Sequence, residues 1–95
     1  MAAYVIANLL VTDPERFELY KILSAVAVKA HGGRFLIRGG RLETVEGAWT
    51  PNRLTVIEFP SWEAATTYVH SSEYALAREA RTKAASVDML VVEGL

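Results

Sequence analysis

The order of strand-like and helix-like segments is the feature of this chain that most limits its fold. Four segments rich in β-branched and aliphatic residues, at 4–11, 34–47, 53–59 and 87–94, are predicted to be strands. Helical start signals and helical spacing of apolar residues lie between the first and second strands and between the third and fourth. The predicted order is therefore β-α-β-β-α-β, and no linker or composition break divides the 95 residues.

Capping residues mark the ends of the helices. Thr12 and Glu15 have the spacing of a capping box, with Asp13 as the competing N-cap, and Gly32 is expected to end the first helix. The second helical segment begins at Ser61, and the serine pair at 71–72 breaks or re-caps it before a helix over 73–85.

Two right-handed crossovers around a central hairpin specify the topology. The second and third strands form the hairpin, with "AWTPN" (48–52) as its turn. The result is a four-stranded antiparallel sheet with both helices on one face, the ferredoxin-like plait of the α+β class. Residues 1–95 are expected to form this single domain.

The sheet face without helices is predicted to be apolar. Alternation along the strands directs Phe35, Ile37, Ile57 and Phe59 toward the helices. The opposite face then receives six apolar side chains: Tyr4, Ile6, Leu10, Leu36, Leu54 and Val56. A solvated sheet face is not built this way, and 52% hydrophobic residues are more than one small core hides. We therefore expect a homodimer, a dimeric α+β barrel whose sheets enclose a cavity.

Three polar residues, Asn8, Arg38 and Glu58, are expected on this apolar face. A buried charge must be paired or face a wet pocket. One interpretation is a structural ion pair between Arg38 and Glu58. A second makes Arg38 the anchor for a carboxylate ligand, oriented by Asn8 and Glu58. A third is that the strand register is wrong by one residue.

The first helix has two apolar faces. One is predicted to cover the sheet, and the opposite one carries Leu19, Ile22, Leu23 and Val26. An aliphatic face does not belong in water, so we expect a second oligomer contact there. The alternative is that this face packs against the other helix or a chain terminus.

Composition and motifs exclude several classes of function. A net charge of −1 does not provide the excess of positive charge that is typical of nucleic-acid-binding proteins. The absence of cysteine excludes thiol chemistry and thiolate metal sites. The glycines do not have phosphate-loop spacing, and neither a metal nor a cofactor is expected. The first apolar run is too short to span a bilayer and lacks a basic flank, so a cytoplasmic location is the default expectation.

His31 lies at the end of the first helix. A cationic imidazole there suits the helix dipole, which favours a structural role. Because His31 is close in sequence to the second strand, it also stays a candidate for the pocket.

The stretches "GGRFLIRGG", "VEGAWTPNRLTVIEFPSWEAA" and "YVHSSEYALAREAR" resemble the bacterial domain-of-unknown-function family 1330. The resemblance implies a ferredoxin-like fold of the dimeric α+β barrel superfamily and no established activity. The positions that fit the family pattern are Asp13, Tyr20, Gly32, Gly33, Arg38, Gly39, Gly40, Glu46, Gly47, Arg53, Glu58, Phe59, Tyr74 and Arg81. His31 departs from a position that is usually aromatic, and Ser72 from a common proline.

Three hypotheses for function follow. The leading one is a homo-oligomer that binds a small, carboxylate-bearing organic molecule in a pocket at the sheet–sheet interface, using Asn8, His31, Arg38 and Glu58. The alternative is a cofactor-independent monooxygenase or isomerase of the dimeric α+β barrel type. In the third, the polar trio only closes the dimer.

Overall fold

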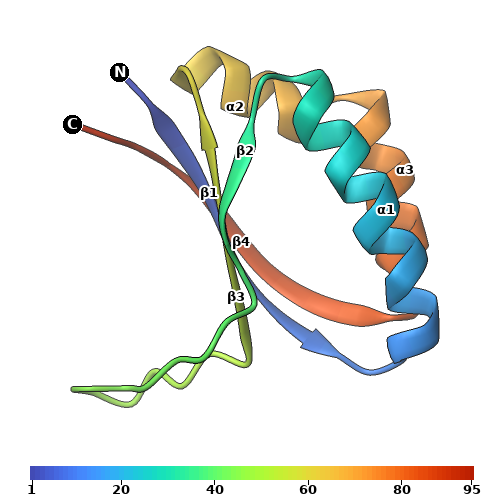
Figure 1. Ribbon diagram of the computed structural model, residues 1–95, viewed down its shortest axis with the longest axis vertical. Helices are drawn as coiled ribbons and strands as arrows, with labels where there is room; N and C mark the ends of the chain where they lie inside the picture. Colours follow the sequence, from blue (N-terminus) through green and yellow to red (C-terminus); the bar gives the residue numbers. More distant parts are fainter.

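The computed structural model describes residues 1–95 as a four-stranded antiparallel sheet with three helices on one face (Figure 1). The elements follow in the order β1 (Ala3–Val11), α1 (Pro14–Ala30), β2 (Arg34–Arg38), β3 (Arg53–Phe59), α2 (Trp62–Val69), α3 (Ser72–Arg81) and β4 (Ala85–Glu93). The strand order is β2-β3-β1-β4, which confirms the ferredoxin-like topology, with a break in the second helical segment.

The central strand β1 fixes which side chains face the helices. It pairs antiparallel with both neighbours, so that Val5 lies opposite Ile57 on β3 and Val91 on β4. The helix-facing set of β1 is buried up to Leu9, whereas Tyr4, Ile6 and the other alternate residues keep part of their surface. The predicted alternation in β1 and β3 is therefore confirmed.

The helix boundaries follow the capping residues. The Asp13 side chain accepts the N–H of Arg16 at 3.2 Å, so Asp13 and not Thr12 is the N-cap of α1. Gly32 has a φ of +75° immediately beyond the helix, as a C-terminal glycine should. Ser71 re-caps the chain by accepting the N–H of Tyr74 at 3.1 Å, and this cap separates α3 from α2.

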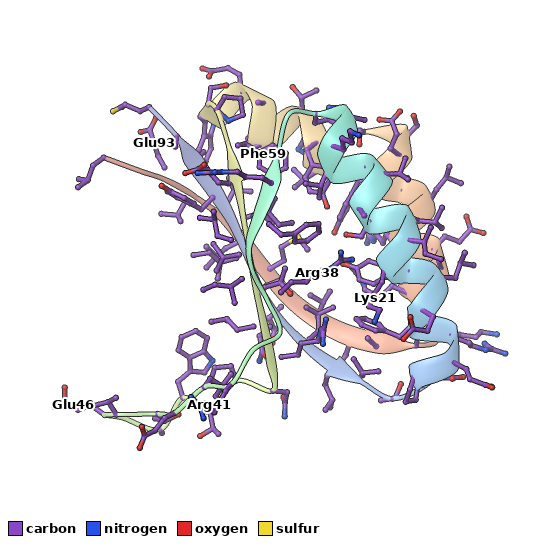
Figure 2. The ribbon with its side chains drawn as sticks, viewed as in Figure 1. Lys21, Arg38, Arg41, Glu46, Phe59 and Glu93 are labelled. Carbon is purple, nitrogen blue, oxygen red and sulfur yellow. The ribbon has the colours of Figure 1, made fainter.

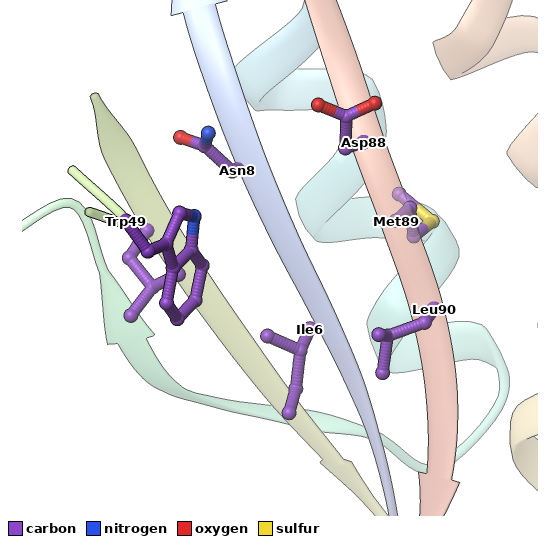
Figure 3. A pocket seen from close by; sticks show the side chains of 7 residues that line it. Ile6, Asn8, Trp49, Asp88, Met89 and Leu90 are labelled. Atoms are coloured by element: carbon purple, nitrogen blue, oxygen red, sulfur yellow. The ribbon is translucent and has the colours of Figure 1, made fainter. Parts of the chain in front are cut away.

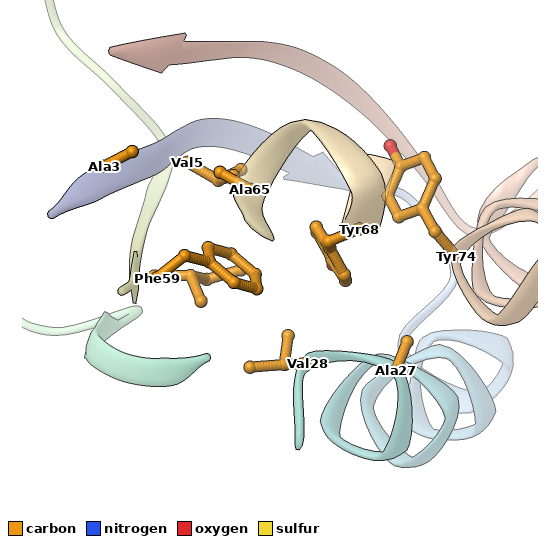
Figure 4. Packing of buried hydrophobic residues seen from close by; sticks show 9 residues of the cluster. Ala3, Val5, Ala27, Val28, Phe59, Ala65, Tyr68 and Tyr74 are labelled. Carbon is orange, nitrogen blue, oxygen red and sulfur yellow. The ribbon is translucent and has the colours of Figure 1, made fainter. Parts of the chain in front are cut away.

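The core lies between the helices and the sheet (Figure 4). At its centre the rings of Phe59 and Tyr68 lie 4.9 Å apart, and Tyr74 packs edge-on against Tyr68 at 5.2 Å. Phe59 is fully buried and Val28 of α1 is almost so, so one aromatic cluster joins β3, α2, α3 and the end of α1.

Strand β2 differs from its prediction in length and in register. It ends at Arg38 instead of continuing to residue 47, because Gly39 takes a φ of +68°. A β-bulge places the extra residue Leu36 between Phe35, opposite Ile57, and Ile37, opposite Val56. The predicted orientations of Ile37 and Arg38 are therefore wrong: Ile37 lies on the open face and Arg38 on the helix face.

Residues 39–52 form a long exposed loop that joins β2 to β3. It projects from the sheet on the side away from the helices, at the lower left of Figure 1. Val45 and Trp49 are largely exposed on it. The predicted turn at 48–52 is thus the last part of a much wider connection.

Two outer surfaces are apolar. The open sheet face carries Leu10, Ile37, Leu90 and Val92 as large exposed side chains. On α1, Leu19, Ile22 and Val26 are 54%, 63% and 59% exposed, so this face does not pack against another part of the chain, whereas Leu23 packs against the core. No helix has the length and apolar character needed to cross a bilayer.

Replacing Gly33 by alanine tests the packing of the core. A Cβ at Gly33 would lie 2.6 Å from Cε1 of the buried Phe59 ring, so Gly33→Ala should destabilise the fold by about 1–3 kcal/mol. Gly40 has no atom within 4 Å of the corresponding position, and Gly40→Ala should change stability by less than about 0.5 kcal/mol. Urea unfolding measures both. Equal losses in the two variants would contradict this packing.

Candidate functional site

The four residues expected to form one pocket lie in three places. Asn8 and Glu58 are on the open sheet face, opposite Leu54 and Tyr4 respectively. Arg38 lies on the helix face of β2 and points toward α1 (Figure 2). His31 caps the C-terminal end of α1. The structure therefore does not assemble these residues into a single site.

Glu58 forms an ion pair, but with a different arginine from the one predicted. Nε of Arg34 donates to Oε1 of Glu58 at 2.7 Å, and the Tyr4 hydroxyl donates to Oε2 at 3.4 Å. The bulge is the cause, because it keeps Arg34 on the same face as Glu58 while moving Arg38 to the other. The predicted Arg38–Glu58 pair is wrong.

Arg38 lines a narrow cleft between α1 and the β2–β3 edge of the sheet. Its guanidinium lies 4.2 Å from the centre of the Phe35 ring, and its Nη2 donates to the carbonyl oxygen of Lys21 at 2.7 Å. Arg53, at the start of β3, places its guanidinium 5.4 Å from the centre of the Phe17 ring. Two arginines thus meet at the cleft, each over an aromatic ring.

The cleft is rich in cations and contains no carboxylate. Its lining is Leu9, Phe17, Tyr20, Lys21, Ser24, Phe35, Arg38, Arg53 and Thr55. Lys21 is engaged by Glu18 at 3.1 Å, but neither arginine forms an ion pair. Gly39 makes room for this arrangement, since a Cβ there would lie 2.5 Å from Nη1 of Arg53. The cleft is narrow, and its volume of about 10 Å³ holds about one water molecule.

Polar groups continue from the cleft into the core. Burial raises the pKa of the Tyr68 phenol above its ordinary value; the Tyr20 and Tyr74 phenols add to the shift, and Ser24 and Arg81 oppose it. Arg81 is buried, its guanidinium lies 5.7 Å from the centre of the Tyr20 ring, and its Nη1 has no hydrogen-bond partner. The Arg81 cation thus lies beside the ring of Tyr20, which lines the cleft.

His31 joins two helices instead of lining the cleft. Its Nε2 lies 2.7 Å from Oε1 of Glu73, in the first turn of α3, and its ring packs edge-on against Tyr68 at 6.1 Å. The hydrogen bond with His31 lowers the pKa of the Glu73 carboxyl. No three His, Asp or Glu side chains come close enough together to hold a metal ion.

A second concavity, of about 200 Å³, lies on the open sheet face (Figure 3). Its lining is Ile6, Asn8, Trp49, Leu54, Asp88, Met89 and Leu90. Asn8 and Asp88 are directly opposite each other on β1 and β4. Oδ1 of Asn8 accepts the N–H of Asn52 at 2.8 Å, which ties the end of the 39–52 loop to the sheet.

The fold and its solved neighbours define the class of protein. A dimeric ferredoxin-like protein of unknown function from Jannaschia sp. CCS1 has a TM-score of 0.72 and 12% identity, covering 99% of this chain and 100% of that one. SnoaB, a cofactor-independent oxygenase from Streptomyces nogalater, has a TM-score of 0.68 and 12% identity, covering 99% and 93%. This chain therefore has a ferredoxin-like fold, which these neighbours share.

The family is narrower than the fold. Residues 2–95 match the domain of unknown function DUF1330, and the chain belongs to that family. A protein of unknown function from Rhodopseudomonas palustris has a TM-score of 0.75 and 17% identity, covering 99% of this chain and 82% of that one. No curated protein matches the chain.

Three residues that line these two concavities are absent from the site predicted from the sequence. Arg53 is predicted only as the first residue of a strand and as a position of the family pattern, although the strand alternation that directs Thr55 inward also directs Arg53 inward. Asp88 could have been placed on the open face by the same alternation in β4. Trp49 gave no usable signal, because its position depends on the path of the long loop.

The Glu73–His31 contact predicts a pH-dependent stability. Because the folded-state pKa of Glu73 is lowered, the contact stabilises the fold above the ordinary pKa of about 4.5 and is lost as the pH falls through the lowered value. The melting temperature of wild type should exceed that of Glu73→Gln at neutral pH, and the difference should shrink below pH ~4.5. A difference that is constant from pH 7 to pH 3 would contradict this role.

Proposed function

We propose that this protein binds a small carboxylate-bearing organic molecule in the cleft between α1 and the β2–β3 edge, with Arg38 and Arg53 as anchors for the carboxylate. One observation supports this most strongly: two guanidinium groups without acidic partners line the same cleft, each over an aromatic ring. Guanidinium groups bind carboxylates through paired, charge-assisted hydrogen bonds.

The neighbouring side chains suit the rest of such a ligand. Phe17 and Phe35 offer apolar surface, and the hydroxyls of Ser24 and Thr55 offer hydrogen bonds further in. Because the cleft has room for about one water molecule, ligand entry requires Arg38 to leave the Lys21 carbonyl and requires α1 to separate from the β2–β3 edge. Arg38 is exposed and tethered by a single neutral acceptor, so an incoming carboxylate is a stronger partner for it.

This location differs from the sheet–sheet interface that the strand alternation suggested. Arg38 would then bind the ligand on the helix face, without help from Glu58, which Arg34 already neutralises. Asn8 and His31 would also take no part, since they lie on the open face and at the far end of α1.

An enzyme would use the same cleft in a different way. SnoaB is described as a cofactor-independent oxygenase, and it shares this fold at 12% identity. In this chain the residues that line the cleft include neither an imidazole nor a carboxylate. The two groups most often used in general acid–base chemistry are therefore missing, and only Tyr20 and the ion-paired Lys21 remain, so the lining favours binding.

We further propose that the protein is a homodimer paired through its open sheet face. The row Ile37, Val56, Ile6 and Leu90 crosses all four strands and forms a continuous apolar band. Exposed bands of this kind are typical of subunit interfaces. The dimeric neighbours from Jannaschia and from Bacteroides fragilis agree with this assembly.

Aromatic acids provide the test of the cleft. Benzoate and 4-hydroxybenzoate should raise the melting temperature, since a ligand at ten times its Kd stabilises the native state by about 1.4 kcal/mol. Arg38→Gln or Arg53→Gln should abolish the rise, because each removes a charge that faces the carboxylate. Differential scanning fluorimetry measures the shifts.

Arg41→Gln is the matched control, since Arg41 is an exposed arginine on the adjoining loop and lies outside the cleft. The Arg41→Gln variant should keep the full ligand-induced rise in melting temperature. The proposal fails if none of these acids stabilises the wild type, or if all three arginine variants respond alike.

The assembly is tested by two substitutions on different surfaces. Leu90→Asp places a charge in the apolar band and should convert the dimer to a folded monomer. Ile22→Glu tests whether Leu19, Ile22 and Val26 form a second contact, with Leu23 behind them; it should lower a higher oligomer to a dimer. Light scattering gives the masses. Unchanged masses would reject the respective contacts.

A further inference from the structure

We propose that the concavity on the open sheet face is a second binding site, for a small organic cation such as a primary amine, with Asp88 as the counter-charge and Trp49 as an aromatic wall (Figure 3). The site is on the opposite face of the sheet from the arginine cleft. The inference therefore does not depend on the function proposed for that cleft.

The charge of Asp88 determines the class of ligand. Asp88 is exposed and forms no ion pair within the chain, and the rest of the lining contains no cation. Its nearest cross-strand neighbour is Asn8, whose Oδ1 is already held by the N–H of Asn52. The free amide N–H₂ of Asn8 can donate to an oxygen or stay solvated, but it cannot neutralise a carboxylate. A carboxylate ligand would be repelled here, and an ammonium group would be attracted.

Trp49 and the aliphatic floor supply the remaining contacts. In Figure 3 the indole of Trp49 stands beside Asn8 and Ile6, across the concavity from Asp88 and Leu90. An indole face and a carboxylate together form the usual environment for an organic cation. The volume of about 200 Å³ is below the range of about 300–1,000 Å³ for drug-sized ligands, so the amine must be small.

Pairing of two sheets would strengthen the requirement for a cation. A second copy on the open face would remove water from Asp88, and an unpaired carboxylate in such a place is strongly unfavourable. The cation could then be the ligand or an arginine of the second copy, for which the exposed Arg41 on the 39–52 loop is the candidate. The volume of about 200 Å³ leaves room for a ligand, and the experiment below distinguishes the two.

Trp49 can report on the site directly. The chain has two tryptophans, so Trp62→Phe leaves Trp49 as the only indole emitter. Benzylamine should change the Trp49 emission saturably, while benzyl alcohol and benzoate, which keep the ring and lose the positive charge, should bind at least about tenfold more weakly. Asp88→Asn in the same background should weaken benzylamine by about tenfold or more.

Two control variants test whether benzylamine binds at the concavity on the open sheet face. Glu43→Gln removes an exposed carboxylate from the same loop, outside the concavity, and should leave benzylamine affinity unchanged. Arg53→Gln should also leave it unchanged, since Arg53 belongs to the other face of the sheet.

Three results would overturn the proposal. The first is equal binding of benzylamine and benzyl alcohol. The second is unchanged benzylamine affinity in Asp88→Asn. The third is a lowered molecular mass of both Asp88→Asn and Arg41→Gln with no amine binding by wild type, because that result would assign Asp88 to an ion pair between copies.

Discussion

The antiparallel pairing of β1 with β3 on one side and β4 on the other is the constraint on which both surfaces of the molecule depend. The pairing is continuous along β1, so every second residue of three strands faces the helices and the two core clusters beneath them. The remaining residues form the open face, with its apolar band and its concavity. A shift of one residue anywhere in β1 would exchange these two sets.

The parts of the fold that follow from local chemistry could be predicted from the sequence. Asp13, Gly32 and Ser71 act as caps where the sequence indicates them, and β3 spans the residues that its alternation predicts. Strand β2 could not be read in the same way, because Phe35, Leu36 and Ile37 are all apolar. Either register buries a large side chain, and only pairing with β3 selects the bulged one.

The candidate sites were predicted less well than the fold, for a related reason. The residues next to Arg38 in the sequence are enough to identify it as unusual. Its neighbours in space depend on the register of the edge strand β2, which the sequence does not give. Its observed companion Arg53 comes from the next strand, and the partner of Glu58 is Arg34. The concavity around Asp88 depends on the path of a loop that carries no local structural signal.

The bulge at Leu36 makes the location of a charge depend on how β2 pairs with β3 and not on the sequence of β2 alone. Between Arg34 and Arg38 the chain has one residue more than regular pairing with β3 can accommodate, and that residue separates the two arginines onto opposite faces. A relative with the same residues in this strand but regular pairing with β3 would place both arginines on the same side of the sheet, although an alignment would show no difference between the two chains. In comparisons among such proteins, the presence or absence of the bulge therefore carries more information about the position of the charge than the identity of the aligned residues.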